Sequence, residues 1–171
     1  MQTIIINDEK LTDNDIQMNV IRVKGLVITK TGKILLAYNN HTYQFLGGHV
    51  EEGEDIKLSL IREIKEEAGI TVEIEEDPFL NIITYDHDYF NTGRKVKNSI
   101  YYYRIFSDEI PNFSLTKYDE LERKSDFELY YVDLLGLEDF LKRNISSGEI
   151  DENIGREMLY ALEVYNQVYG G

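Results

Sequence analysis

The chain has 171 residues, a length that suits one compact domain rather than two. Hydrophobic residues make up 42% of it, enough to supply a core, while 32 acidic and 18 basic residues give a formal net charge of −14. That sign argues against a long nucleic-acid partner, because such binding rests on lysines and arginines that neutralise phosphates. The lack of cysteine excludes disulfides, thiolate metal sites and cysteine nucleophiles.

The first ten residues carry an apolar patch, Ile4 to Ile6, with no basic region before it. They are too short and too acidic for a signal peptide. No apolar run in the chain approaches the length of a membrane-spanning helix. We therefore expect a cytoplasmic protein with no membrane partner.

Strand and helix patterns alternate along the chain. β-branched residues predict a strand over 20–28, and a turn at 30–33 leads to a partner strand over 34–38. A helix is expected over 55–68, because Asp55 can cap its start and Gly69 stands where a glycine ends a helix. The remaining predictions are strands over 71–74, 80–85, 99–106 and 129–132, a polar loop over 107–126, and helices over 134–143 and 152–168.

Strands on either side of a helix, with more helices at the end, predict an α/β sandwich. We expect residues 1–171 to form a single domain with its core at about 18–143. Residues 144–171 are then a C-terminal helical addition. This addition either packs on the core or forms a dimer interface.

The most informative segment is 47–70, GGHVEEGEDIKLSLIREIKEEAGI. Its two leading glycines let the backbone turn tightly and approach a ligand closely. The helix that follows has one apolar face, formed by Leu60, Ile61, Ile64 and Ala68. Three glutamates lie one turn apart on its other side, namely Glu63, Glu66 and Glu67.

Three clustered carboxylates repel one another unless a hard divalent cation lies among them. Mg²⁺ prefers oxygen ligands and often bridges carboxylates to substrate phosphates. Such a site can screen phosphate charge, polarise a phosphorus–oxygen bond and acidify a bound water. The alternative is that these glutamates form the solvated face of a helix in an acidic chain.

The same segment resembles the box of the Nudix hydrolase family, G-x5-E-x7-R-E-U-x-E-E-x-G-U, where U is aliphatic. Every fixed position is filled, by Gly48, Glu54, Arg62, Glu63, Ile64, Glu66, Glu67, Gly69 and Ile70. Outside the box the resemblance is looser and covers about residues 18 to 143. It implies a Nudix-like α/β/α sandwich with a mixed β-sheet, plus a C-terminal helix.

The resemblance also implies a metal site. Glu63, Glu66 and Glu67 would hold Mg²⁺, for which Mn²⁺ can substitute, and the backbone carbonyl of Gly48 or Gly47 would add a ligand. These ligand positions agree with the helix spacing. One departure stands close by, since family members often have proline where this chain has Leu46. Proline would stiffen the loop, so its absence raises the question of how the loop is held.

The implied reaction is attack of water on one phosphorus of a nucleoside diphosphate linked to a group X. The products are a nucleoside monophosphate and phospho-X. Glu63 or Glu67 would take the proton of the water. Arg62 and Glu54 resemble the family's supporting ion pair, which orients the catalytic glutamates.

Candidates for substrate contact lie later in the chain. Tyr85 belongs to a set of tyrosines that could stack on a nucleobase. Some family members take the base from a later loop, for which Glu120, Glu122 and Glu128 are the candidates here. We expect the partner to be a small phosphorylated nucleotide-like substrate, with a homodimer as an open option.

A second function class stays open, a non-catalytic Nudix-fold module that binds nucleotides or regulates. Such modules usually lack one or more of the box glutamates, whereas this chain has all of them. A diphosphate-isomerising relative is disfavoured because it is expected to need a cysteine.

Overall fold

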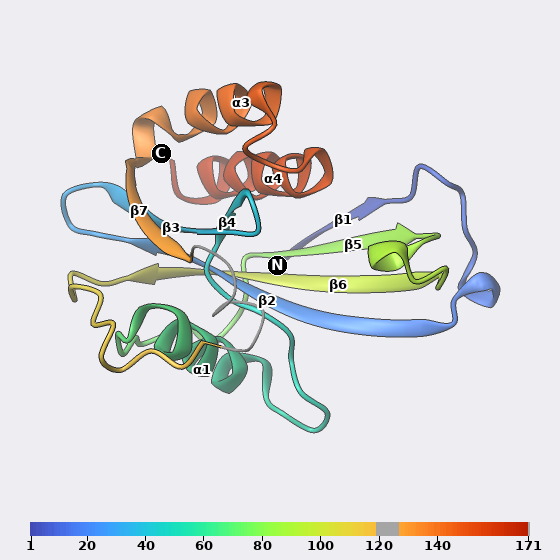
Figure 1. Cartoon of the computed structure of the whole chain (residues 1–171), viewed down its shortest axis with the longest axis horizontal. Helices are drawn as coiled ribbons and strands as arrows, with labels where there is room; N and C mark the ends of the chain where they lie inside the picture. Colours follow the sequence, from blue (N-terminus) through green and yellow to red (C-terminus); the bar gives the residue numbers. More distant parts are fainter. Residues whose placement is uncertain (119–126, 171) are drawn as a thin grey trace.

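The computed structural model describes residues 1–118 and 127–170, apart from the side chain of Phe90. Within these residues, seven strands form one sheet with three α-helices against it (Figure 1). The strands are β1 (Gln2–Ile6), β2 (Met18–Ile28), β3 (Lys33–Asn39), β4 (Thr42–Phe45), β5 (Leu80–Asp86), β6 (Val96–Phe106) and β7 (Glu128–Asp133). The helices are α1 (Ile56–Ala68), α3 (Leu137–Ser147) and α4 (Glu152–Tyr169), with 3-10 turns at Asp13–Asp15, Tyr89–Asn91 and Leu134–Gly136.

The sheet is mixed, as the sequence predicts. Its strand order is β1-β5-β6-β2-β3-β4, and β7 pairs with β3. The pairs β1–β5 and β2–β6 are parallel, whereas the other pairs are antiparallel. The long β2–β6 pair, with Met18 opposite Val96 and Ile28 opposite Phe106, forms the centre of the sheet.

Helices cover both faces of this sheet, which confirms the predicted sandwich. α1 lies on one face, while α3 and α4 lie together on the other (Figure 1). Side chains alternate across a strand, so β2 serves both layers. Val23 and Val27 join the core under α1, and Leu26 and Ile28 join the core under α3 and α4.

Helix α1 begins and ends where its sequence predicts. Asp55 accepts hydrogen bonds from the backbone N–H groups of Lys57 and Leu58, which would otherwise have no partner in the first turn. Gly69 ends the helix in the left-handed region, with φ of 69°. A Cβ at Gly69 would stand 2.0 Å from the carbonyl oxygen of Asn112, so the following loop packs closely on this end.

The predicted strand over 71–74 is wrong. Residues 71–75 form no strand, although Val72 is buried and Ile74 packs against the core under α1. An extended segment can bury alternate side chains without joining a ladder, which explains the misleading period of two. Conversely, two strands were not predicted from the sequence. One is β1, which contains the apolar patch at Ile4 to Ile6, and the other is β4, residues 42–45.

The C-terminal segment packs on the core of the same chain. Asp151 caps α4 by accepting from the N–H groups of Asn153 and Ile154. The buried side of α4 comprises Met158, Ala161, Leu162, Val164 and Tyr165, all in the core under α3 and α4. None of the helices in residues 1–118 and 127–170 combines the length and the apolarity needed to cross a membrane.

Candidate active site

Gly47 and Gly48, the second of which opens the box, follow β4 and run against β2. Gly47 has φ of 129°, and a Cβ there would stand 2.1 Å from the carbonyl oxygen of Val23. A Cβ at Gly48 would stand 2.5 Å from the carboxyl carbon of Glu63. Gly47 therefore lets the loop approach the backbone of β2, and Gly48 leaves room for a glutamate of α1.

Glu67 joins helix α1 to this loop. Its side chain is 4% exposed, and its Oε2 accepts a hydrogen bond of 2.8 Å from the backbone N–H of Gly47. The hydroxyl of Tyr118 donates to the backbone carbonyl of Glu67 at 3.3 Å. Glu67 is thus buried by the glycine loop, rather than standing on a solvated helix face.

Arg62 forms ion pairs with the other three glutamates of the box, Glu54, Glu63 and Glu66. Its Nε and Nη2 donate to the two carboxylate oxygens of Glu54, each at 2.9 Å, which is the ion pair that the resemblance implies. Its Nη1 donates to Glu63 at 2.8 Å and to Glu66 at 3.2 Å. The same guanidinium also reaches the carbonyl oxygen of His49 at 3.2 Å, so it ties the helix to the glycine loop. The forked geometry suits arginine rather than lysine.

The carboxylates around Arg62 differ in acidity. The hydrogen bonds from Arg62 hold the pKa of Glu54 at about 2, below its ordinary value of 4.5. Burial raises the pKa of Glu63, and the nearby charge of Glu66 raises it further against the opposing effect of Arg62. Glu63 is therefore the carboxylate with the stronger tendency to take a proton.

The donor set fits a divalent cation. Glu54, Glu63 and Glu66 surround Arg62, Glu67 lies against the loop, and all four carboxylates offer the hard oxygens that Mg²⁺ prefers. Within residues 1–118 and 127–170, no three acidic or histidine side chains converge as a finished metal centre. The carboxylates of Glu63 and Glu66 point instead to Arg62, so these two side chains would have to turn toward a metal, whereas Glu67 is held by the Gly47 N–H through one of its two oxygens.

The two candidate carbonyl ligands are held by β2. The carbonyl oxygen of Gly48 accepts from the N–H of Val23 at 3.0 Å, and that of Gly47 accepts from the Nζ of Lys24 at 3.1 Å. An ammonium on the Gly47 carbonyl repels a second cation there. Of the two, the Gly48 carbonyl is therefore the better candidate ligand.

Lys24 is a site residue that the sequence analysis missed. It is 4% exposed, and burial together with the charge of Arg22 lowers its pKa from 10.5 to about 8. The charges of Glu67, Glu157 and Glu63 act in the opposite direction. A lysine inside the run from Val23 to Ile28, whose other residues are apolar or glycine, was the available signal, because buried lysines are rare unless they are paired.

Other polar residues border the same part of β2. Arg22 pairs with His49 as an isolated bridge, and the Nε atom of Arg22 is buried without a hydrogen-bond partner among the described residues. His49 Nε2 lies 3.2 Å from the hydroxyl oxygen of Tyr89. Burial lowers the pKa of His49, and the neighbouring Arg22 and Lys24 lower it further.

The remaining sequence candidates are not brought to the glycine loop by any contact of the described residues. Tyr85 donates to Asp13 at 2.9 Å, and the ammonium of Lys97 lies 5.4 Å from the centre of its ring. Glu128 is in β7 and accepts from Tyr130. Glu120 and Glu122 fall outside the described residues.

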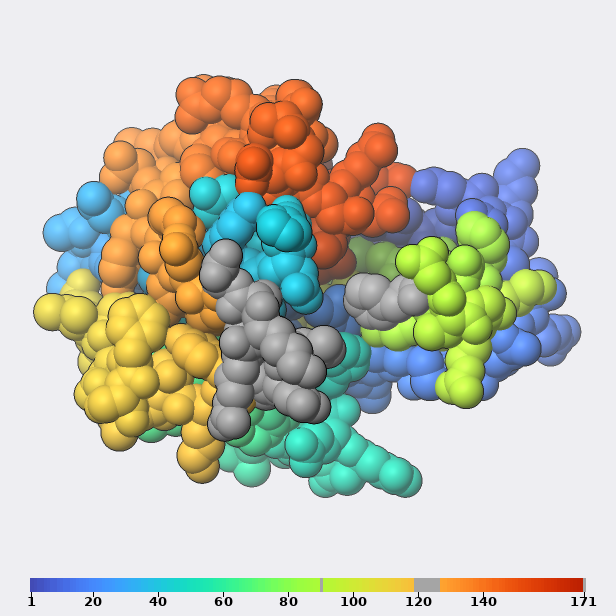
Figure 2. All heavy atoms as spheres, viewed as in Figure 1, coloured from blue at the N-terminus to red at the C-terminus, as the bar shows by residue number. Residues whose placement is uncertain are grey.

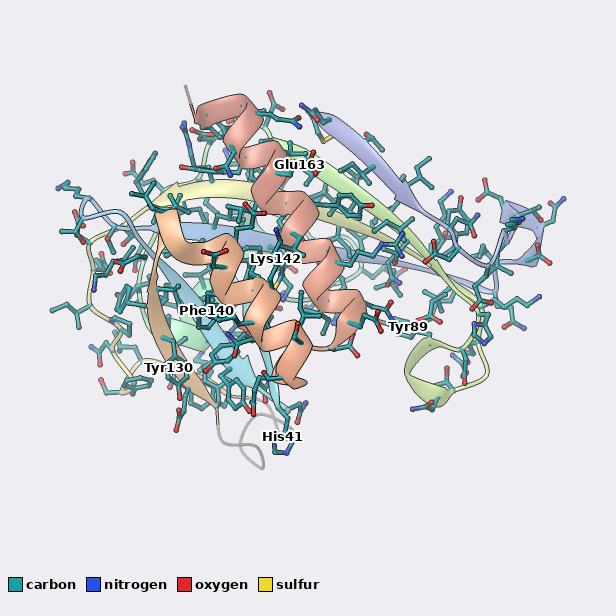
Figure 3. All side chains as sticks on the ribbon, turned by 90° about the horizontal axis from the view of Figure 1, so that it is seen from above. His41, Tyr89, Tyr130, Phe140, Lys142 and Glu163 are labelled. Atoms are coloured by element: carbon teal, nitrogen blue, oxygen red, sulfur yellow. The ribbon has the colours of Figure 1, made fainter. Side chains whose placement is uncertain are left out.

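A groove of about 750 Å³ lies elsewhere, between α3 and α4. Lys142 of α3 and Glu163 of α4 line it, as Figure 3 shows from above. It belongs to the face of the sheet opposite α1, so it is separate from the box glutamates. On the side of α1, the loop after β4 projects at the lower edge of the molecule (teal in Figure 2).

A NUDIX domain model matches residues 18–149. The chain belongs to the Nudix family. The glycine loop, α1 and all the box residues of this Nudix protein lie inside the matched range. The matched range therefore includes the segment that carries the glutamate cluster.

One curated relative of this Nudix protein is the CTP pyrophosphohydrolase of Escherichia coli (strain K12). The two are 37% identical over 65 residues, which cover 34% of this chain and 48% of the relative. The chain thus spans about half the length of the curated relative that it matches.

Solved structures show the same fold at low sequence identity. A MutT protein from Methanosarcina mazei Go1 is 18% identical with a TM-score of 0.57, over 87% of this chain and 96% of that one. A C. elegans Ap4A hydrolase in a binary complex is 20% identical with a TM-score of 0.54, over 89% and 98%. A NUDIX family hydrolase from Clostridium perfringens is 22% identical with a TM-score of 0.52, over 84% and 96%. At these identities the likeness concerns the fold alone.

Proposed function

We propose that this Nudix protein is a Mg²⁺-dependent pyrophosphohydrolase that cleaves the diphosphate linkage of a small nucleoside diphosphate derivative. The observation that carries the proposal is the Arg62 cluster next to the glycine loop. There Glu54, Glu63 and Glu66 share one guanidinium, and Glu67 accepts from Gly47. Such an excess of carboxylates serves a reaction on phosphates only when a divalent cation joins it.

Within this cluster the side chains have different roles. Glu66 and Glu67 would hold the metal, together with the Gly48 carbonyl. Bound there, the metal would supply charge neutralisation on the diphosphate and lower the pKa of a water. Arg62 keeps the carboxylates in place, and Glu54 fixes Arg62 through the paired hydrogen bonds.

Glu63 is the candidate general base. Its carboxyl group lies against Gly48, and burial raises its pKa. A carboxylate with a raised pKa is a stronger proton acceptor, so Glu63 is better suited than Glu54 to take the proton of the attacking water. The water oxygen bonds to one phosphorus while the anhydride bond to the other phosphate breaks, and the proton taken by Glu63 is then released to solvent, so the net reaction is a hydrolysis.

The experiment is a panel of diphosphate compounds with wild-type protein. The panel includes nucleoside triphosphates such as CTP, Ap4A, ADP-ribose, nucleotide sugars and oxidised dNTPs, each with Mg²⁺, Mn²⁺ or EDTA. We expect phosphate products from at least one class, only with metal. Metal-dependent binding of a nucleotide without turnover of any compound would instead support a non-catalytic module.

A further inference from the structure

Lys24 is a buried lysine beside the glycine loop that has no role in the proposed reaction. Its side chain is 4% exposed, and its Nζ donates to Gln44 Oε1 at 3.1 Å, to the Phe45 carbonyl at 3.0 Å and to the Gly47 carbonyl at 3.1 Å. An ammonium has three N–H donors, and these three contacts occupy all of them. Lys24 therefore has no donor left for a substrate phosphate in this arrangement.

These contacts complete a set that holds the whole loop. Residues 23–25 of β2 bind four successive carbonyls, because the N–H of Gly25 donates to Leu46 at 2.9 Å and the N–H of Val23 donates to Gly48 at 3.0 Å. The Nζ of Lys24 donates to the other two carbonyls, those of Phe45 and Gly47, which alternate with the carbonyls of Leu46 and Gly48 along the loop. Backbone donors of a strand reach only alternate residues of a neighbouring segment, and here a side chain supplies the donors for the others.

No proline restricts the loop, because position 46 is leucine. Leu46 lies between Phe45 and Gly47, whose carbonyls Lys24 binds. Leu46 itself is fully buried under α1. The peptide N–H of Gly47 then donates to Glu67. Gly47 thus links the two groups, because its carbonyl accepts from the Lys24 ammonium and its N–H donates to the carboxylate of Glu67.

We propose that Lys24 is a positioning residue, which fixes the glycine loop so that the Gly47 N–H holds Glu67 in place for the metal. This inference rests on the proposed function for its effect on catalysis, whereas its effect on the loop does not. Lys24 acts through the backbone and touches neither metal nor substrate. Residues that orient metal ligands in this way typically change metal affinity or activity by about 10–100-fold when they are replaced.

The test compares Lys24→Met with Lys30→Met, an exposed lysine that pairs only with Asp108 among the described residues. Three quantities are measured: hydrogen exchange of the Gly47 amide by NMR, Mn²⁺ affinity by EPR, and kcat and KM at saturating Mg²⁺. For Lys24→Met we expect exchange at least ~10-fold faster. We also expect Mn²⁺ affinity and kcat to be lower by roughly 10–100-fold, while KM stays within about threefold of wild type. Lys30→Met should match wild type in all three.

Two results would overturn the proposal. One is a raised KM with wild-type kcat, Mn²⁺ affinity and amide exchange, which would mean that Lys24 meets the substrate directly. The other is a Lys24→Met protein that matches wild type throughout. If Lys24→Met does not fold, Lys24→Gln, which retains two N–H donors, is judged by the same criteria. If wild type shows no turnover at all, the proposed function fails, and the exchange of the Gly47 amide still decides the role of Lys24.

Discussion

Two cations hold the candidate site from opposite sides, and they do so with different partners. Among the described residues, Arg62, on α1, binds three carboxylates in addition to the His49 carbonyl and the Ser59 hydroxyl, whereas Lys24, on β2, binds two carbonyls and an amide and no carboxylate. The Arg62 side consists mainly of carboxylates on side chains, which can turn toward a metal. The Lys24 side consists of neutral backbone that is fixed to the sheet. The comparison indicates that separate residues hold the backbone of the glycine loop, on the Lys24 side, and the carboxylates of α1, on the Arg62 side.

The largest expected effect is a difference in stability between alanine variants of the two adjacent glycines, Gly47 and Gly48. Gly47→Ala places a Cβ against the backbone of β2 at a positive φ, where neither side can yield. We expect a loss of unfolding free energy of about 3 kcal/mol or more, measured by urea denaturation. Gly48→Ala presses only on the end of the Glu63 side chain. It should lose under about 1 kcal/mol of stability while kcat falls roughly 10–100-fold. Equal losses of unfolding free energy in the two variants would contradict the division into a fixed loop backbone and carboxylates that can turn.

A smaller effect is expected from Arg62→Lys, which keeps the charge and removes the fork. A lysine cannot bind both oxygens of Glu54 and still reach Glu63 and Glu66. We expect kcat to fall by about 10-fold or more, with little change in the exchange of the Gly47 amide. Faster exchange at Gly47 would mean that the two sides are one coupled unit. The measurement pairs steady-state kinetics with NMR on the same sample.

The smallest effect is a pH dependence of stability on the Arg62 side. Glu54 has a folded pKa of about 2 against an ordinary 4.5, so its contribution is complete above pH 4.5 and is lost as the pH falls toward 2. After allowance for solvent around this partly exposed pair, we expect Glu54→Gln to lower the unfolding free energy by about 1–2 kcal/mol at pH 7. Urea denaturation between pH 7 and 3 should show the gap to wild type closing below pH 4.5. A gap that stays constant with pH would contradict the assignment.

The sequence predicts the Arg62 side well because that side is local. Helix spacing makes Glu63, Glu66 and Glu67 neighbours on a capped helix, and the resemblance to the Nudix box implies the pairing of Arg62 with Glu54. The mixed sheet and the sandwich also follow from patterns along single elements. Short-range periodicity is the signal that single sequences carry most clearly.

The Lys24 side could not be predicted because it depends on pairing between distant segments. Lys24 and Gly47 meet only when the loop after β4 runs along β2, and nothing in their spacing indicates this. The same limit explains the errors in the strands. Residues 71–74 have the pattern of a strand but join no ladder, while β1 is a strand because β5 offers it a parallel edge. Pairing is a tertiary choice, which propensity alone does not decide.

The measurement that tests the central claim most directly is product release from the best substrate of the panel, with Mg²⁺ titrated. It compares wild type, Glu67→Gln and Glu73→Gln, an exposed glutamate outside the box. The account predicts that turnover needs the metal, falls by roughly 10²–10⁴-fold in Glu67→Gln and is unchanged in Glu73→Gln. Turnover that persists in EDTA and in Glu67→Gln would contradict it.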